Sequence, residues 1–180
     1  PKLSKVCESI LKNKPNLICL PHVETSTGII LDDDYIKEVG ETARKVDSIV
    51  CLDGIASGTM WIDMENLNID AYITAPQKGW SSPASCGVIM INERADNKIK
   101  NSISNSLILD LNKWSNVTDA YINDKFMYHC TVPTDSIIKF SETIEETLEF
   151  GLIKAENNAK YVGKEIRKLF RKLLEFLTRL

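Results

Sequence analysis

Two short apolar segments with an amphipathic segment between them organise the first third of the chain. Residues 17–20 and 48–52 are typical of strands buried in a parallel sheet. Between them, residues 32–34 offer helix caps and first-turn acids. The helical face that follows carries Ile36, Val39, Ala43 and Val46. Because strand, helix and strand form a βαβ unit, we expect parallel strands whose carboxyl-terminal loops share one edge of the sheet.

The pattern extends on both sides of this unit. Residues 2–12 predict an amphipathic helix, and residues 69–74 predict a third strand. Residues 87–91 predict a fourth strand, antiparallel because its connection is short. Residues 21–28 read as a polar loop, and residues 93–120 as loops with short helical pieces. The prediction is an α/β fold of three layers, α/β/α, with a mostly parallel sheet.

The last third of the chain predicts two consecutive helices. Thr134 or Asp135 is expected to cap the first helix, and Gly151 to end it. Lysines and arginines cover one side of the second helix, and such a basic amphipathic helix can bind a membrane or calmodulin. A packing helix whose partner lies elsewhere is the favoured interpretation. Its apolar stripe is Ile166, Leu169, Phe170, Leu173, Leu174 and Leu177.

Composition limits which kinds of partner, and which cellular compartment, suit this chain. The net charge of -3 argues against nucleic acid as an obligatory partner. The sequence shows no apolar run that could span a bilayer and no signal-peptide pattern, so no membrane partner is expected. Five scattered cysteines suit reduced cytoplasmic thiols better than disulfides or zinc, and no metal site is predicted. The absent initiator methionine and the immediate helix face suggest a piece of a longer protein.

Residues that can carry chemistry follow the predicted strand ends. Asp53 comes directly after the second strand, and Lys78 follows the third, behind Pro76 and Gln77. A pyridine aldehyde cofactor needs such a pair: the amine forms a Schiff base, and the acid keeps the ring nitrogen protonated. The shared edge also makes Thr25 a neighbour of Asp53. Plainer interpretations exist, namely a solvated loop charge for Lys78, a cap or turn acid for Asp53, and a loop-stabilising hydroxyl for Thr25.

Four separated motifs give these residues a common context. They are residues 22–28 (HVETSTG), 53–57 (DGIAS), 76–78 (PQK) and 127–133 (MYHCTVP). In this order and at this spacing they resemble the class V aminotransferases, the alanine–glyoxylate and serine–pyruvate group of pyridoxal-phosphate enzymes. The resemblance runs from the first strand to the helices after Pro133 and covers only the middle of such an enzyme. Phosphate-loop, dinucleotide, His-Glu-x-x-His and Gly-x-Ser-x-Gly patterns are absent from the sequence.

The resemblance implies a role for each residue near the strand ends. Lys78 resembles the lysine that forms the Schiff base with pyridoxal 5'-phosphate, and Asp53 the acid paired with the pyridine nitrogen. By the same resemblance, Ile55 would pack on one face of the ring. Thr25 would hydrogen-bond the phenolic oxygen, and Gln77 would contact the phosphate.

The resemblance also implies an assembly and a fold. Tyr128 and Thr131 look like the pair that reaches the phosphate in the neighbouring subunit, which implies a homodimer with shared sites. The implied fold is the type I fold of pyridoxal-phosphate-dependent transferases. Residues 1–151 would form part of its cofactor-binding large domain, and residues 152–180 a long helix that leads to a small domain.

The implied activity is transamination between a small amino acid and a 2-oxo acid of the glyoxylate or pyruvate type. A lyase or desulfurase uses the same fold and cofactor, and a non-catalytic or split fragment that needs a complementing chain is the alternative from another class. Gly54 and Pro76 depart from frequent serines, and Cys130 from a frequent histidine. The family's phosphate loop and ring-stacking residue would precede residue 1, and its carboxylate-binding arginine would follow residue 180.

Overall fold

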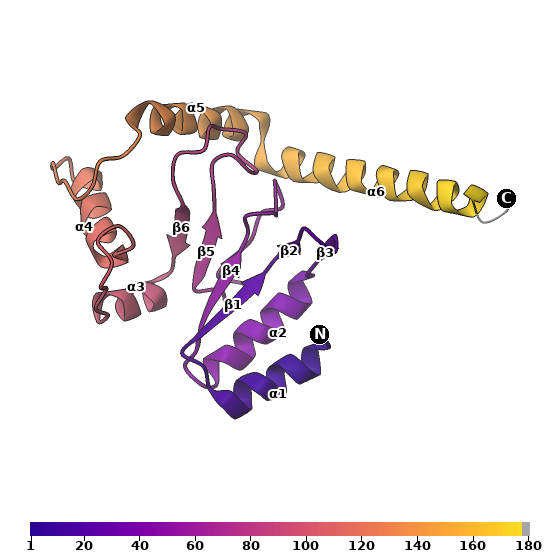
Figure 1. Cartoon of the computed structure of the whole chain (residues 1–180), viewed down its shortest axis with the longest axis horizontal. Helices are drawn as coiled ribbons and strands as arrows, with labels where there is room; N and C mark the ends of the chain where they lie inside the picture. Colours follow the sequence, from indigo (N-terminus) through magenta and orange to yellow (C-terminus); the bar gives the residue numbers. More distant parts are fainter. Residues whose placement is uncertain (178–180) are drawn as a thin grey trace.

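A four-stranded sheet with the strand order β1-β4-β5-β6 is the centre of the molecule (Figure 1). The computed structural model describes the backbone of residues 1–177 and the side chains of residues 1–174. The strands β1 (Leu17–Pro21), β4 (Ile49–Asp53) and β5 (Ala71–Thr74) are parallel. The strand β6 (Val88–Ile91) pairs antiparallel with β5. The predicted α/β class, the mostly parallel sheet and the antiparallel fourth strand are confirmed.

Two helices, α1 (Leu3–Asn13) and α2 (Asp33–Arg44), pack against each other beside β1 and β4 (Figure 1). The side chain of Asp32 caps α2, because it accepts a hydrogen bond of 2.8 Å from the backbone N–H of Tyr35. The apolar face of α2 then meets the strands, as its spacing predicts. The resulting core consists of Ile36, Ala43, Val50, Leu52, Leu67, Ile69 and Tyr72.

A small hairpin follows β1, so the prediction of a polar loop over residues 21–28 was wrong in part. The hairpin pairs β2 (Val23–Glu24) with β3 (Ile29–Ile30). Its turn closes because Gly28, at φ +67°, donates its N–H to the Glu24 carbonyl over 2.9 Å. Strands of two residues are too short to show the alternation on which the sequence reasoning depends.

Two regular helices occupy the region predicted as loops with short helical pieces. They are α3 (Glu93–Lys100) and α4 (Leu111–Ile122). Each begins at a side-chain cap: Asn92 accepts the N–H of Ala95 over 2.9 Å, and Asp110 accepts the N–H of Lys113 over 3.2 Å. In the sequence, the two helices are marked by these capping residues and not by a broad apolar stripe. Hydrophobic periodicity alone therefore does not reveal the two helices.

The helices α5 (Thr134–Phe150) and α6 (Leu152–Leu177) follow as predicted, but the cap of α5 differs. The capping residue is Pro133 and it makes no side-chain bond, so the expected cap by Thr134 or Asp135 is wrong. Gly151, at φ +97°, ends α5 as predicted.

The helix α6 projects away from the sheet (Figure 1). Its apolar stripe is exposed from Ile166 to Leu174, and no described element covers it. The side chain of Leu177 and residues 178–180 of the predicted 152–180 segment lie outside the described residues. Within residues 1–177, no helix has an apolar stretch long enough to cross a bilayer.

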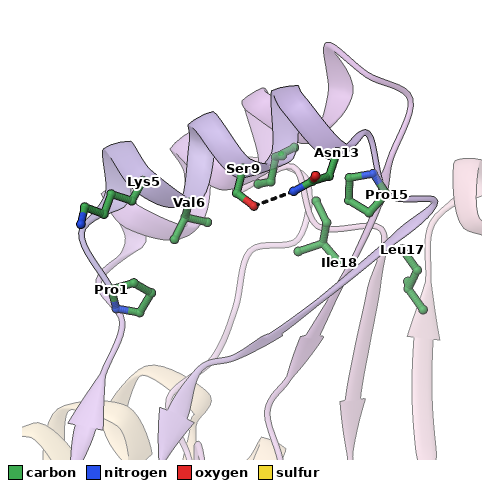
Figure 2. A pocket seen from close by; sticks show the side chains of 9 residues that line it. Pro1, Lys5, Val6, Ser9, Asn13, Pro15, Leu17 and Ile18 are labelled. Atoms are coloured by element: carbon green, nitrogen blue, oxygen red, sulfur yellow. Dashed lines mark hydrogen bonds between the residues drawn. The ribbon is translucent and has the colours of Figure 1, made fainter.

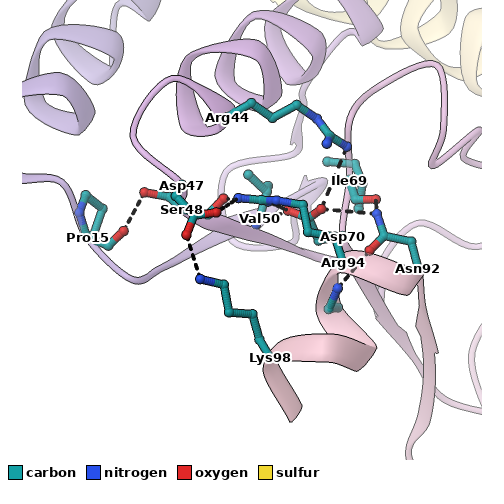
Figure 3. A network of polar contacts seen from close by, with 11 residues as sticks. Pro15, Arg44, Asp47, Ser48, Val50, Ile69, Asp70, Asn92, Arg94 and Lys98 are labelled. Carbon is teal, nitrogen blue, oxygen red and sulfur yellow. Dashed lines mark hydrogen bonds and ion pairs between the residues drawn. The ribbon is translucent and has the colours of Figure 1, made fainter. Parts of the chain in front are cut away.

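A buried ion pair fixes the amino-terminal edge of the sheet (Figure 3). Asp70, which is fully buried, accepts hydrogen bonds from the Val50 N–H over 2.9 Å, from Asn92 over 3.1 Å and from Arg94 over 2.8 Å. Arg94 also reaches Asp47 over 2.9 Å. Because these groups join β4, β5 and α3, they hold the frame of the sheet at the edge opposite its carboxyl ends.

Candidate functional site

The carboxyl ends of β4 and β5 bring Asp53 and the Lys78 loop to one edge of the sheet. Asp53 is the last residue of β4 and is in register with Ile73 of β5. The loop of residues 75–82 follows β5, and the two strands are parallel, so both segments leave the sheet on the same side. The side chains of Asp53 and Lys78 are both exposed, and neither is enclosed by packed core.

The loop that carries Lys78 is tightly folded. The N–H of Lys78 donates to the Ala75 carbonyl over 3.2 Å, and the N–H of Ser82 donates to the Pro76 carbonyl over 3.1 Å. Ala75 and Pro76 are buried, whereas Gln77 and Lys78 are exposed. The loop therefore presents two adjacent polar side chains on a fixed base, and within the described residues Lys78 forms no ion pair.

A contact between two glycines joins this loop to the turn after β4. A Cβ added at Gly79 would lie 2.0 Å from the carbonyl oxygen of Gly58, so only glycine permits this approach. The turn after Asp53 and the turn around Lys78 are consequently packed directly against each other. Gly58 and Gly79 are 21 positions apart, and each directly follows one of the motifs, 53–57 and 76–78.

The Asp53 carboxylate is only partly used by its own turn. Its Oδ1 accepts a hydrogen bond of 3.0 Å from the Ile55 N–H. One carboxylate oxygen of Asp53 therefore acts as the plainer interpretation expects, by stabilising the turn. Among the described residues, Oδ2 accepts no hydrogen bond, so it is available to a cationic group at the sheet edge.

Three buried polar side chains lie beneath this turn, and the sequence analysis assigned none of them a role in the site. His22, Ser57 and Tyr72 are 3%, 4% and 9% exposed. The His22 Nδ1 and the Ser57 Oγ are 2.7 Å apart, and the Tyr72 phenol lies against Gly54 in the same turn. His22 is thus a buried histidine with a hydrogen-bond partner. Ser57 could have been found from its place in the 53–57 motif, but Tyr72 looked like an ordinary strand residue.

Burial sets the protonation of this group. It lowers the pKa of His22 below its ordinary value of 6.5, although the Asp33 carboxylate opposes the effect. Burial raises the pKa of the Tyr72 phenol above its ordinary value, with the Ser57 hydroxyl opposing. Near neutral pH the three side chains are therefore uncharged.

The remaining candidates near the edge are more loosely placed. Thr25 lies exposed in the turn of the β2–β3 hairpin, and no hydrogen bond among the described residues joins it to Asp53. Ile55 is half-buried directly after the Asp53 turn. The predicted closeness of Thr25 and Asp53 therefore remains a prediction.

Tyr128 and Thr131 form a pair of their own. Their hydroxyl oxygens are 3.1 Å apart, and both residues are exposed in the segment between α4 and α5. Within the described residues, no hydrogen bond or ion pair joins them to Asp53 or Lys78. An exposed hydroxyl pair of this kind can bind an anion brought by another molecule, as the predicted role across a subunit boundary requires.

Two surface hollows lie away from these residues. One, of about 500 Å³, lies between α1 and the start of β1 and is lined mainly by Val6, Ile10, Pro15 and Ile18 (Figure 2). The other, of about 790 Å³, lies beside Asn92 and Arg94 at the amino-terminal edge. Neither includes a candidate residue, so the site rests on the strand-end chemistry and not on cavity size.

The donor set at the carboxyl edge fits pyridoxal phosphate. It combines an exposed amine on Lys78, an amide on Gln77 and a carboxylate oxygen of Asp53 that accepts no hydrogen bond within the described part of the chain. The Ser82 Oγ, in the same loop, is buried and has no hydrogen-bond partner among the residues that the structure describes. Among the described residues, no group of three or more His, Cys, Asp or Glu side chains is arranged to hold a metal ion.

Comparison with known proteins gives one consistent result. The family model described as aminotransferase class-V matches residues 2–178. The chain is 28% identical over 176 residues to the alanine–glyoxylate aminotransferase of Oryctolagus cuniculus, with 96% of this chain and 43% of the relative covered. It is 29% identical over 164 residues to the (S)-ureidoglycine–glyoxylate transaminase of Bacillus subtilis, with 82% and 39% covered.

The solved structures agree. The ureidoglycine–glyoxylate aminotransferase from Bacillus subtilis superposes with a TM-score of 0.76 at 27% identity, over 87% of this chain and 40% of that one. An alanine–glyoxylate aminotransferase from Nostoc sp. superposes with a TM-score of 0.79 over 93% of this chain and 45% of that one. Because the two sequences are only 20% identical, this similarity bears on the fold alone. The chain thus spans less than half the length of these relatives.

Proposed function

The chain belongs to the class-V aminotransferase family, and on that premise we propose that it forms the central part of the cofactor-binding domain of a transaminase. The proposed reaction moves an amino group between a small amino acid and a 2-oxo acid of the glyoxylate or pyruvate type. Pyridoxal phosphate is the cofactor that family membership implies. Two of the similar proteins are glyoxylate aminotransferases by name, which supports this substrate class.

One observation carries the proposal more than any other. The Asp53 carboxylate and the Lys78 loop leave neighbouring parallel strands at the same edge, and the Gly79–Gly58 contact packs their turns together. An acid and an amine in two such turns supply both groups that the cofactor requires. The opposite edge, where Asp70 and Arg94 neutralise each other, offers no comparable free pair among the described residues.

Lys78 and Asp53 would do most of the chemical work of this segment. When bound, the cofactor supplies an aldehyde that bonds to amines and a ring that accepts electrons from a substrate carbon. The Lys78 Nζ would hold the cofactor covalently, and after release it would move a proton between the substrate carbon and the cofactor carbon. Positioned proton transfer of this kind contributes roughly 10²–10⁴-fold to rate. The Asp53 Oδ2 would hold the ring nitrogen in its protonated form.

The other candidates would orient the cofactor. Thr25 would donate to its phenolic oxygen, Ile55 would pack on the ring, and Gln77 would bind the phosphate. Tyr128 and Thr131 would bind the phosphate in a second subunit, and this assignment requires a homodimer. The 3.1 Å hydroxyl pair, exposed to solvent, supports the last assignment.

Covalent trapping tests the proposal. The full-length protein that carries this chain is incubated with pyridoxal phosphate, and the visible absorption band is followed before and after reduction with borohydride. Reduction is expected to leave the cofactor attached to Lys78 in peptide maps. Lys78→Ala should abolish the adduct, while Lys113→Ala, a change at another exposed lysine, should retain it. An adduct at a different lysine, or none in the wild-type protein, would refute the assignment.

A second candidate function follows from the share of its relatives' length that the chain covers. Because the chain spans 43% of a relative's length, it could act as a split or non-catalytic segment that needs a complementing chain. The same trapping experiment separates the two. A band that forms only after the remaining segments are added as a separate chain supports complementation, whereas a band in a single full-length chain supports the first proposal.

A further inference from the structure

A buried hydrogen-bond group directly beneath Asp53 has no place in the roles assigned so far. Its members come from three separate segments: His22 follows β1, Ser57 lies in the turn after β4, and Tyr72 lies within β5. Buried polar groups cost free energy unless they are satisfied. Here the His22 Nδ1 and the Ser57 Oγ lie 2.7 Å apart, and the Tyr72 phenol packs against Gly54 in the same turn. The group therefore ties three neighbouring strands together at one point, just below the edge that carries Asp53.

The backbone around Asp53 is held from both sides by the same residues. The N–H of His22 donates to the Asp53 carbonyl over 2.9 Å, and the N–H of Ser57 donates to the Gly54 carbonyl over 3.0 Å. From β5, the Ile73 carbonyl accepts the N–H of Gly54 over 2.8 Å. These bonds hold the backbone from which the Asp53 side chain projects, and two of the three donors are the N–H groups of His22 and Ser57.

The ring of Tyr72 closes this arrangement from below. A Cβ added at Gly54 would lie 2.0 Å from the ring Cζ and from the hydroxyl oxygen of Tyr72. Gly54 thus lets the turn lie directly on the phenol, and the phenol prevents the turn from moving into the sheet. The same contact explains why glycine suits the position after Asp53 in this chain.

We propose that His22, Ser57 and Tyr72 form a positioning network that aims the Asp53 carboxylate at the ring nitrogen of the cofactor. This inference rests on the proposed function for its cofactor and on the structure for its geometry. His22 and Tyr72 are positioning residues, since they touch Asp53 and its turn and have no assigned contact with substrate. An uncharged network leaves the full negative charge of Asp53 for the ring nitrogen.

Two variants test the network. His22→Phe keeps a ring in the buried space and removes the bond to Ser57, while Tyr72→Phe removes only the phenolic hydroxyl. Thr42→Val is the matched control, because Thr42 is also a buried polar residue, lies on α2 and is 1% exposed. All are made in the full-length protein, which is loaded with pyridoxal phosphate labelled with nitrogen-15 in the ring.

The decisive measurement is the nitrogen-15 chemical shift of the ring, which reports whether that nitrogen is protonated. Both network variants are expected to move it toward the unprotonated position at neutral pH and to lower kcat/KM by about tenfold to a hundredfold. Thr42→Val should leave the shift unchanged even if it destabilises the fold. Network variants with the wild-type shift would overturn the inference.

Amide hydrogen exchange without cofactor separates this inference from the proposed function. The N–H groups of Gly54, Ile55 and Ser57 should exchange faster in both network variants and at the wild-type rate in Thr42→Val. Unchanged exchange would contradict the network even in an active transaminase. Faster exchange together with an unprotonated ring nitrogen in the wild-type protein would instead remove the role proposed for Asp53, and the network's purpose with it.

Discussion

At the scale of single residues, two aspartates at opposite edges of the sheet show how surroundings decide a role. Asp70 is fully buried, and its carboxylate is used by Val50, Asn92 and Arg94. Asp53 is exposed and keeps an oxygen free. The sequence analysis placed Asp53 at a strand end correctly, but it could not identify Asp70 as a buried charge. That identification needs Arg94, which follows twenty-four residues later and approaches only after β6 has paired with β5.

The first prediction concerns Asp70. Asp70→Ala should lower the free energy of unfolding by about 3–5 kcal/mol, because it leaves Arg94 and the Val50 N–H without their buried partner. Urea denaturation measures the loss. Asp119→Ala, at an exposed position on α4, serves as the control and should change stability little. Equal losses in the two variants would contradict the structural role of the buried pair.

The second prediction concerns the pH dependence of stability. Because burial lowers the pKa of His22 in the folded protein, the unfolded chain takes up a proton first as pH falls below about 6.5. His22 should therefore lower the free energy of unfolding as pH drops from 7 toward the folded pKa, and contribute nothing to the slope at pH 8.

Urea denaturation between pH 8 and pH 5.5 checks this dependence. His22→Phe should flatten the curve, while Thr42→Val, at a buried polar residue that does not titrate, should leave the wild-type slope. Parallel curves for the wild type and His22→Phe would show that His22 titrates as it does in the unfolded chain.

At the scale of elements, long regular segments were predictable and short or cap-dependent ones were not. Each predicted element has an apolar pattern that extends over several residues or helical turns. These elements are the strands β1, β4, β5 and β6 and the helices α1, α2, α5 and α6. The β2–β3 hairpin depends on one turn closed by Gly28, and α3 and α4 depend on caps at Asn92 and Asp110. Such features are set by single hydrogen bonds, which leave little trace in a hydrophobic pattern.

The third prediction tests the contact between the two site turns. Gly79→Ala would bring a methyl group against the Gly58 carbonyl, so the Lys78 loop must move and stability should fall by about 1–3 kcal/mol. The yield of cofactor trapped on Lys78 should fall as well. Gly87→Ala is the control, because an added Cβ there meets no atom within 4 Å. Wild-type stability and trapping in Gly79→Ala would mean that the two turns are not held together by this approach.

At the scale of the whole molecule, the sheet was predictable but the attachment of the helices after it was not. The βαβ rule gives parallel strands with a common carboxyl edge, and that edge places the candidate site. The position of α5 and α6 depends on contacts between loops and helices that are 60 to 96 residues apart, which no local pattern encodes. Trp61 donates its Nε1–H to the Leu152 carbonyl over 2.8 Å, Thr59 reaches the Ala155 carbonyl, and Trp80 packs edge-on against Phe140. The division of the chain at residues 151 and 152 remains a prediction.

These few contacts lead to the fourth prediction, which concerns how firmly α6 is held. Trp61→Phe keeps an aromatic ring against Trp80 but removes the bond to the Leu152 carbonyl, at a cost of about 0.5–1.5 kcal/mol. Since α6 otherwise projects from the sheet (Figure 1), this loss should speed amide hydrogen exchange in the first turns of α6 and leave β4 and β5 protected. Trp114→Phe is a matched control, because its indole N–H donates to the Ile108 carbonyl within its own region. Its effect should stay near residues 106–114. If Trp61→Phe instead raised exchange across β4 and β5, the helices and the sheet would unfold as one cooperative unit, and the contacts at Trp61 would be part of the core.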